Sequence, residues 1–212
     1  MNKGRLKLDH IDYFILDEAD EMLNIGFREE IEEIMEGTPK DKKVLLFSAT
    51  MPKAILNIAE KYMGAYDLVS IKSKTLSNQN ISQKYYDVSP RNKFEALCRI
   101  MDAEETFYSI IFCRTKSDVD DVTSNLVSRG FLAEAIHGDI EQKAREKILK
   151  RFKDAKIKIL VATDVAARGI DVEDLNYVVN YSLPENPEIY THRIGRTGRA
   201  GKSGTAISFV SR

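Results

Sequence analysis

Several features are absent from this 212-residue sequence. It has no tryptophan and only two cysteines. No apolar run approaches the ~20 residues that a membrane span requires, and residues 1–8 lack a signal peptide's apolar core. Cys98 and Cys113 have no partners at metal-site spacing, and two cysteines make no disulfide framework. We interpret Cys113, which ends an apolar segment, as a core thiol. We therefore expect a cytoplasmic protein with no membrane partner.

The sequence also lacks a large excess of either charge, since the formal net charge is -1. Residues 1–72 carry 10 Lys and Arg against 14 Asp and Glu, whereas residues 73–212 carry 22 against 19. Neither part is basic enough to indicate nucleic-acid binding by composition. With 43% hydrophobic residues, the chain is long enough to form a buried core. A nucleic-acid function must therefore rest on individual residues.

Apolar segments of strand length alternate with segments of helical periodicity, which predicts an α/β fold with a parallel sheet. In the first part we expect strands at 11–16, 43–47 and 67–71, and helices near 24–36 and 52–63. In the second part the expected strands are 84–88, 108–113, 132–136, 157–162, 176–181 and 205–210, and the expected helices are 90–101, 116–129 and 140–153. The polar residues 73–83 are the expected linker, between an incomplete domain, 1–72, and a complete-looking one, 84–212.

The first candidate site is Asp17-Glu18-Ala19-Asp20, which follows an apolar strand. In open α/β sheets, ligands bind at the carboxyl ends of the strands. Adjacent carboxylates there suit a divalent cation and a proton acceptor. The alternative is a strand end followed by an acidic first helical turn. Ser48-Ala49-Thr50 follows the next strand, and its hydroxyls could bond to a carboxylate or cap the following helix.

Three later segments contain candidate phosphate or sugar ligands. Gln142 and Arg145 share one face at the start of a helix, where an anion is favoured, although an exposed polar face would look the same. Thr163 and Asp164 end a strand, and Asp164 could instead cap a short helix. Asp171 follows a Gly turn and could hold a ribose hydroxyl or belong to a structural turn.

The segment from His192 to Gly201 alternates three arginines with three glycines. Glycines let the backbone approach a ligand, and guanidinium groups bind phosphate in a planar fork. Arg196 and Arg199 are three residues apart, so they could converge on one polyphosphate. The alternative is a solvated basic loop.

Taken together, these motifs resemble the DEAD-box ATP-dependent RNA helicases in order and spacing. The motifs are Asp17–Asp20, Ser48–Thr50, Ile110–Thr115, His137–Asp139 with Gln142 and Arg145, Ala162–Asp171, and His192–Arg199. The family has two RecA-like domains. This chain resembles the last part of the first and nearly all of the second, so we expect an incomplete RecA-like half-domain followed by a parallel-sheet RecA-like domain.

The resemblance implies a role for each motif, with ATP and Mg²⁺ as cofactors and RNA as partner. Asp17 would hold Mg²⁺ through water, and Glu18 would orient and deprotonate the attacking water. Asp20 would bond toward Ser48 and Thr50 and couple nucleotide state to RNA contact, and His192 would help link the two domains. Asp171 would meet the ribose, while Arg196 and Arg199 would reach the γ-phosphate. The positions resembling RNA-backbone contacts are Arg114, Thr115, Gly138, Gln142, Arg145, Thr163 and Asp164.

The sequence departs from the family in having no G-x-x-x-x-G-K-[ST] phosphate loop. The resemblance places the missing loop's strand beside the strands of residues 43–47 and 67–71. We therefore expect residues 1–72 to pair differently, to borrow a strand from another chain by self-association, or to be poorly ordered. We also expect the 212 residues alone not to turn over ATP at a helicase's rate.

Three functions remain open from sequence. The first is enzymatic: part of a DEAD-box helicase that couples ATP hydrolysis to local RNA unwinding. The second is a binding module, with the second domain acting as an RNA platform that is indifferent to sequence. The third is a structural role, in which the chain docks to a protein scaffold. Salt-dependent RNA binding would favour the second over the third.

Overall fold

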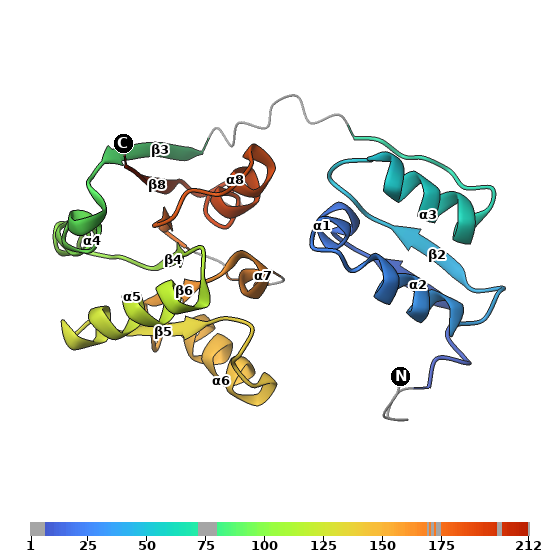
Figure 1. Ribbon diagram of the computed structural model, residues 1–212, viewed down its shortest axis with the longest axis horizontal. Helices are drawn as coiled ribbons and strands as arrows, with labels where there is room; N and C mark the ends of the chain where they lie inside the picture. The colour runs from blue at the N-terminus through green and yellow to red at the C-terminus, as the bar shows by residue number, and fades with distance from the viewer. Residues whose placement is uncertain are drawn as a thin grey trace. The chain divides into compact units, whose positions relative to one another are not determined.

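The computed structural model describes residues 7–71, 80–168, 170, 172, 175–198 and 201–211 (Figure 1). The chain forms two compact units, Met1–Lys72 and Ser73–Arg212. Each unit has its own hydrophobic core, and each is described by itself below. No described helix is long and apolar enough to cross a membrane.

Unit 1 is a two-stranded parallel sheet with three helices. Its elements are β1 (Tyr13–Leu16), α1 (Ala19–Asn24), α2 (Arg28–Glu36), β2 (Lys43–Leu46) and α3 (Lys53–Met63). β1 pairs with β2 so that Phe14 lies opposite Val44. One face of the sheet packs on Ile31 and Met35 of α2 and on Ile55 and Ile58 of α3.

The other face of this sheet is apolar but exposed. Successive side chains of a strand point to opposite faces. Phe14, Leu16, Val44 and Leu46 join the core, whereas Tyr13, Ile15, Leu45 and Phe47 are between 41% and 60% exposed. Among the described residues, therefore, unit 1 covers only one face of its sheet.

One expectation for unit 1 is wrong and another needs a new boundary. The helix expected near 24–36 is α2 and begins only at Arg28, because Gly26 adopts a left-handed conformation with φ of 93° between α1 and α2. The strand expected at 67–71 does not form. Its apolar residues predict a strand, but Leu68, Val69 and Ile71 are exposed and pair with no described strand. The described residues of unit 1 form only the β1–β2 pair. The expectation that residues 1–72 pair differently, borrow a strand or are poorly ordered stays a prediction.

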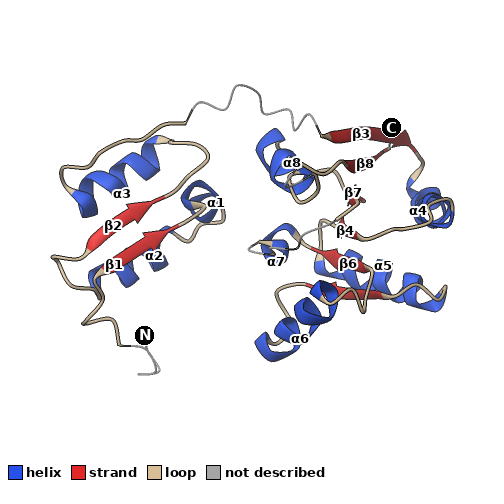
Figure 2. Ribbon diagram, turned by 180° about the vertical axis from the view of Figure 1, so that it is seen from behind, coloured by secondary structure: helices blue, strands red, loops and turns tan. Residues whose placement is uncertain are grey.

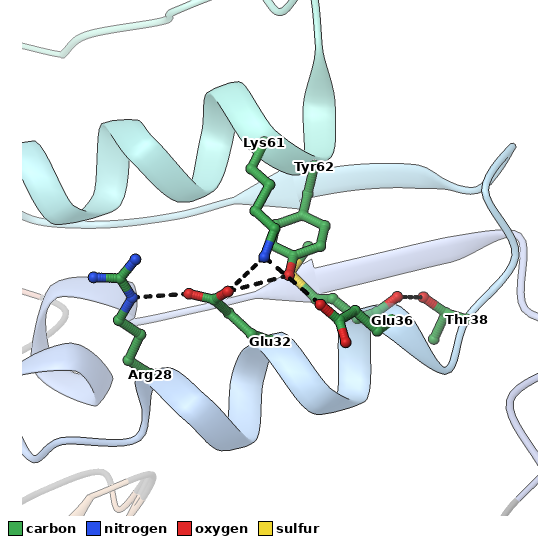
Figure 3. A network of polar contacts seen from close by, with 7 residues as sticks. Arg28, Glu32, Glu36, Thr38, Lys61 and Tyr62 are labelled. Atoms are coloured by element: carbon green, nitrogen blue, oxygen red, sulfur yellow. Dashed lines mark hydrogen bonds and ion pairs between the residues drawn. The ribbon is translucent and has the colours of Figure 1, made fainter.

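A polar network joins α2 to α3 (Figure 3). Glu32 accepts hydrogen bonds from Lys61 Nζ at 2.6 Å and from Arg28 Nε at 2.8 Å. Lys61 also lies 3.6 Å from Glu36. The bonds from Lys61 and then Arg28 lower the pKa of Glu32 to about 2, and the bond to Glu32 raises the pKa of Lys61. The network therefore depends on an ionised Glu32.

Unit 2 is a six-stranded, all-parallel sheet in the order β3-β8-β7-β4-β6-β5 (Figure 2). Its strands are β3 (Ile81–Asp87), β4 (Ser109–Phe112), β5 (Ala133–Ile136), β6 (Ile159–Ala162), β7 (Tyr177–Asn180) and β8 (Gly204–Val210). Its helices are η1 (Pro90–Asn92), α4 (Lys93–Asp102), α5 (Lys116–Ser128), α6 (Gln142–Lys153), α7 (Asp164–Ala167) and α8 (Pro187–Ile194). The predicted α/β class and all six expected strands are confirmed, with small shifts at their ends.

Helices cover both faces of this sheet, and β4 shows how. Ile111 packs in one core cluster with α4 and α5. Ile110 packs in another with Phe152 of α6 and Ala166 of α7. Strands buried on both faces read as continuous apolar runs, which is why this sheet was predictable. Cys113 is fully buried, as expected of a core thiol, and burial raises its pKa to about 12.

Candidate functional site

Four strands of unit 2 end level with one another. Phe112 of β4 lies opposite Ala162 of β6 and Asn180 of β7, and Ile136 of β5 also lies opposite Ala162. The predicted residues follow these ends directly: Arg114 and Thr115 after β4, Gly138 after β5, and Thr163 and Asp164 after β6. Because the strands are parallel, these residues share the carboxyl edge of the sheet, the usual ligand-binding edge.

Thr115 begins α5 through a reciprocal capping box. Its hydroxyl accepts from the N–H of Asp118 at 3.0 Å, and the Asp118 carboxylate accepts from the N–H of Thr115 at 3.2 Å. The neighbouring Lys116 bonds to Asp139, which lowers the Asp139 pKa. The Thr115 hydroxyl therefore caps α5, a role that the sequence analysis did not assign to it, and Lys116 ties the loop after β4 to the loop after β5.

Gln142 and Arg145 lie in the first two turns of α6. Gln142 Nε2 donates to Glu146 at 2.9 Å, and Arg145 Nη2 donates to the carbonyl of Ala166 at 2.7 Å. Gln142 is exposed and Arg145 is half-buried. Arg145 therefore fixes the start of α6 against α7, which begins at Asp164 after β6.

Arg193 is a residue whose role the sequence reasoning missed. It lies in α8, is 3% exposed, and binds Asp164 through Nε at 2.6 Å and Nη2 at 2.8 Å. Its Nη1 donates to Asn180 at 2.9 Å and to the carbonyl of Ser182 at 2.6 Å. Its guanidinium also lies 4.9 Å from the centre of the Phe112 ring. Arg193 therefore holds the carboxyl ends of β6 and β7 together.

His137, which the sequence reasoning also passed over, anchors the loop that contains Gly138. Its Nδ1 accepts from the N–H of Asp139 at 3.4 Å. The ring proton is then on Nε2, 3.0 Å from Asp120 of α5. His137 is 6% exposed. This buried contact fixes the loop between β5 and α6.

Half-buried His192 and Arg196 lie in α8 and just after it. Arg196 Nη1 donates to the carbonyl of Ile170 at 3.2 Å. This contact joins the end of α8 to Ile170, which follows α7 in the chain. Asp171 and Arg199 themselves lie outside the described residues, as does most of the expected linker.

In unit 1, Asp17 and Glu18 follow β1 directly. Asp17 is exposed, and its Oδ1 accepts from the N–H of Glu18 at 2.9 Å. Glu18 precedes α1 in the left-handed region, with φ of 51° and ψ of 42°. A non-glycine residue there costs free energy, and such residues cluster at functional sites. The sequence gives no signal of this conformation.

Asp20 is bonded to the Ser48–Thr50 segment. Its Oδ2 accepts from both the N–H and the hydroxyl of Thr50, each at 2.7 Å, and the N–H of Asp20 donates to Ser48 Oγ at 3.2 Å. Burial pushes the Asp20 pKa upward. The bonds from the Thr50 side chain and backbone outweigh this effect, helped by bonds involving Ser48 and Glu21, so the pKa is lowered. The structure thus contains the contact that the resemblance implies.

The donor set of unit 1 fits Mg²⁺ only as a single-carboxylate site. No group of three His, Cys, Asp or Glu side chains able to hold a metal occurs among the described residues. Mg²⁺ usually keeps several waters and binds through one or two carboxylates plus substrate phosphates. Exposed Asp17 fits that pattern, and we place no other protein ligand beside it.

Comparison with protein families gives two matches. Residues 92–201, about half of the chain, match the helicase conserved C-terminal domain. Residues 1–58 match the DEAD/DEAH box helicase family. The first match contains the level strand ends of unit 2, and the second contains Asp17 to Thr50.

Individual relatives agree with these matches. A probable ATP-dependent RNA helicase of Methanocaldococcus jannaschii is 56% identical over all 212 residues, which cover 56% of that protein. The DEAD-box ATP-dependent RNA helicase CshA of Geobacillus kaustophilus is 49% identical over 211 residues, 45% of its length. The chain thus spans about half the length of the curated relatives it matches.

Solved structures give the same result. A DEAD box protein from the hyperthermophile Methanococcus jannaschii has a TM-score of 0.61 at 55% identity, with all of this chain and 57% of that chain covered. Dbp5 of S. cerevisiae, bound to RNA and ADP BeF3, has a TM-score of 0.85 at 34% identity, with 100% and 56% covered. The predicted RecA-like fold class is confirmed. Together, these matches show that the chain belongs to the DEAD-box family of ATP-dependent RNA helicases.

Proposed function

We propose that this chain is the part of an RNA helicase core that contains the water-activating carboxylates and the second RecA-like domain. Unit 1 is then the end of the first RecA-like domain, residues 73–83 are the linker, and residues 84–212 are the second domain. The intact enzyme couples ATP hydrolysis to local unwinding of RNA. The observation that carries this proposal is the placement of the motif residues at the carboxyl ends of parallel strands in both units.

RNA is the proposed ligand of the level edge in unit 2. The proposed contacting positions are Arg114, Thr115, Gly138, Gln142, Arg145 and Thr163, with Asp164 beside them. Both carboxylate oxygens of Asp164 accept from Arg193, so we assign Asp164 to shaping the loop rather than to direct contact. Contacts to phosphate and sugar position the nucleic acid without reading its sequence. This edge therefore binds RNA of any sequence.

The chemistry of hydrolysis is assigned to unit 1. When bound, Mg²⁺ neutralises charge on the phosphates and orients them. Asp17 would hold the ion through water, and Glu18 would accept a proton from the attacking water. The exposed site at the end of β1 and the left-handed backbone of Glu18 support this assignment. The two bonds that Thr50 donates to Asp20 would couple nucleotide state to the RNA contacts.

Unit 2 would supply the remaining nucleotide contacts. Arg196 and Arg199 would reach the γ-phosphate, Asp171 would bind the ribose, and His192 would help link the two domains. The bond from Arg196 to the carbonyl of Ile170, the residue before Asp171 in the sequence, supports this assignment. A cytoplasmic location stays a prediction.

We further propose that unit 1 associates with another polypeptide strand or with a second copy of itself. The exposed Tyr13, Ile15, Leu45 and Phe47 support this, because a sheet bare on one apolar face is a typical association surface. Equilibrium sedimentation should show a dimer that the double substitution Ile15→Lys and Phe47→Lys dissociates. A monomer at all concentrations would exclude self-association.

One experiment tests the catalytic proposal. The leading part of the Methanocaldococcus jannaschii relative, which precedes the matched region, is fused in front of this chain. We expect RNA-stimulated ATP hydrolysis from the fusion, none at that rate from the chain alone, and loss of hydrolysis in a Glu18→Gln fusion. A folded fusion without RNA-stimulated hydrolysis would refute the assignment. Full activity of the chain alone would refute the need for the missing phosphate loop.

The alternative is a non-catalytic RNA-binding module, which the absence of a phosphate loop from the sequence favours. The same measurements separate the two. If the chain is only a binding module, it binds RNA in a salt-dependent manner, but the fusion described above shows no RNA-stimulated ATP hydrolysis. If the chain binds a protein scaffold and no RNA, neither proposal holds.

A further inference from the structure

Helix α6 is far more basic than its neighbours in unit 2. Its twelve residues include six Lys and Arg but one acid, Glu146. Helix α5, which packs on the other face of the sheet, has one lysine and three aspartates. The two helices therefore differ in sign, and a polyanion beside this sheet is attracted to the α6 side.

The lysines of α6 are arranged in one row on its outward face. Residues three and four apart are neighbours on a helix surface, so Lys143, Lys147 and Lys150 form a continuous row. All three are exposed, while Ile148, Leu149 and Phe152 pack toward the core. At ~1.5 Å per residue, the row is about 10 Å long. We call Lys143, Lys147 and Lys150 the lysine stripe.

The lysine stripe has no internal counter-charge. None of its members forms an ion pair with any described residue, and Glu146 bonds instead to Gln142. Two other cations of α6 are engaged, because Arg151 pairs with Glu134 and Arg145 bonds to Ala166. The remaining one, Lys153, lies in the last turn at the far end of the helix. The stripe therefore supplies most of the available positive charge of α6.

Helix stability does not explain the stripe. Basic residues are favourable in the last turn of a helix, which accounts for Lys150 and Lys153. Lys143 is in the first turn, where the helix dipole disfavours a cation. Like charges four apart, such as Lys143 and Lys147, are mildly destabilising as well. An external anion would remove both penalties.

The stripe begins where the proposed RNA edge ends. Lys143 is adjacent to Gln142, and Arg145 joins α6 to the loop after β6. We propose that the lysine stripe extends the RNA path of unit 2 beyond the level edge and binds about three further phosphates of the same strand. This inference rests on the proposed function, because the edge itself must bind RNA for the path to continue.

The test compares short and long RNA on the full chain. Oligouridylates of about 6 and about 20 nucleotides are titrated at several salt concentrations. The triple substitution Lys143→Gln, Lys147→Gln and Lys150→Gln should weaken binding of the long RNA on the order of tenfold. It should also lower the slope of log affinity against log salt concentration by about 2. The short RNA should change less than about twofold, because it fits on the edge alone.

Two control variants sharpen the result. Replacing the stripe by three arginines should keep the long-RNA affinity and slope. Replacing Lys7, Lys40 and Lys84, which are exposed elsewhere, by Gln removes the same charge and should leave the slope nearly unchanged. If the two triple Gln variants weaken binding of the long RNA equally, the proposal is overturned, because the total positive charge would then explain the affinity without the stripe.

The remaining outcomes also decide. Unchanged long-RNA binding by a folded stripe variant overturns the extended path. The extended path is also overturned if the lysine stripe binds polyglutamate in preference to RNA, because the surface would then be assigned to an acidic protein. If the wild-type chain fails to bind the short RNA, the proposed edge fails instead. In that case the titrations with the long RNA alone test the lysine stripe.

Discussion

Arg193 and Asp164 form a bidentate ion pair, with Nε 2.6 Å from Oδ1 and Nη2 2.8 Å from Oδ2. The pair is joined to Asn180 at the end of β7 and to the carbonyl of Ser182. Arg193 is buried, whereas the Asp164 side chain is 31% exposed. The pair therefore organises the candidate RNA edge from within the fold.

Removing Arg193 should destabilise unit 2 strongly. Arg193→Met leaves Asp164 without its partner and Asn180 without a donor, which should cost about 3–5 kcal/mol. The measurement is urea unfolding followed by a probe in unit 2. Arg99→Met is the matched control, because the Arg99–Glu95 pair is exposed and its loss should change stability far less. Similar losses in the two variants would contradict this interpretation.

The Asp20 contacts should give unit 1 a stability that depends on pH. The folded-state pKa of Asp20 is lowered, so its contribution is present above the ordinary value of 3.8 and is lost as pH falls through the folded value. Thr50→Val removes the hydroxyl donor and should raise the Asp20 pKa and cost about 1–3 kcal/mol. NMR titration of the Asp20 carboxyl carbon reports the pKa. No change on Thr50→Val would show that the backbone bonds suffice.

Glu32 should also make the stability of unit 1 depend on pH in the acid range. Its pKa is lowered from 4.5 to about 2, so its stabilisation is complete above about 4.5 and disappears as pH falls toward 2. Glu32→Gln should flatten this part of the acid-unfolding profile. Glu33→Gln, on the exposed side of the same helix, should leave the profile as it is. Identical profiles for the two variants would argue against the network's importance.

Gly198 should tolerate no side chain. Its φ is +68°, and an added Cβ would lie 2.6 Å from Ile81 Cγ1. Gly130 has a similar φ of +88° but open space around it. Gly130→Ala should therefore cost only the backbone strain, about 1–2 kcal/mol, and Gly198→Ala should cost clearly more. Thermal unfolding of the two variants measures the difference, and equal shifts would show that Ile81 moves aside.

The second unit was largely predictable because its strands are buried on both faces and its helices have regular apolar faces. Ile110 and Ile111 illustrate this, since both are fully buried on opposite sides. Residues 67–71 were not predictable in the same way. A strand requires a neighbour to pair with, and a local apolar pattern does not reveal whether one exists.

The sequence predicted where the site lies in the sheet but not which side chains contact one another there. The motif residues follow apolar strands, and that pattern alone assigns them to the carboxyl edge of the sheet. Arg193 precedes the alternation of glycines and arginines and lies inside a helix that begins at Pro187 with an Asn186 cap. Its partners, Asp164 and Asn180, are 29 and 13 residues away. No local pattern reveals such contacts.

The order of the strands across unit 2 has a consequence for any elongated ligand. Along the chain, the loops follow β4, β5, β6 and β7, but across the sheet the order is β5, β6, β4, β7. A strand of RNA laid along this edge would therefore pass Gly138 first, then Thr163, then Thr115, and only then Ser182. Distance along the ligand is thus unrelated to distance along the sequence. Two motifs that are neighbours in the sequence can therefore contact nucleotides that are not adjacent in the RNA.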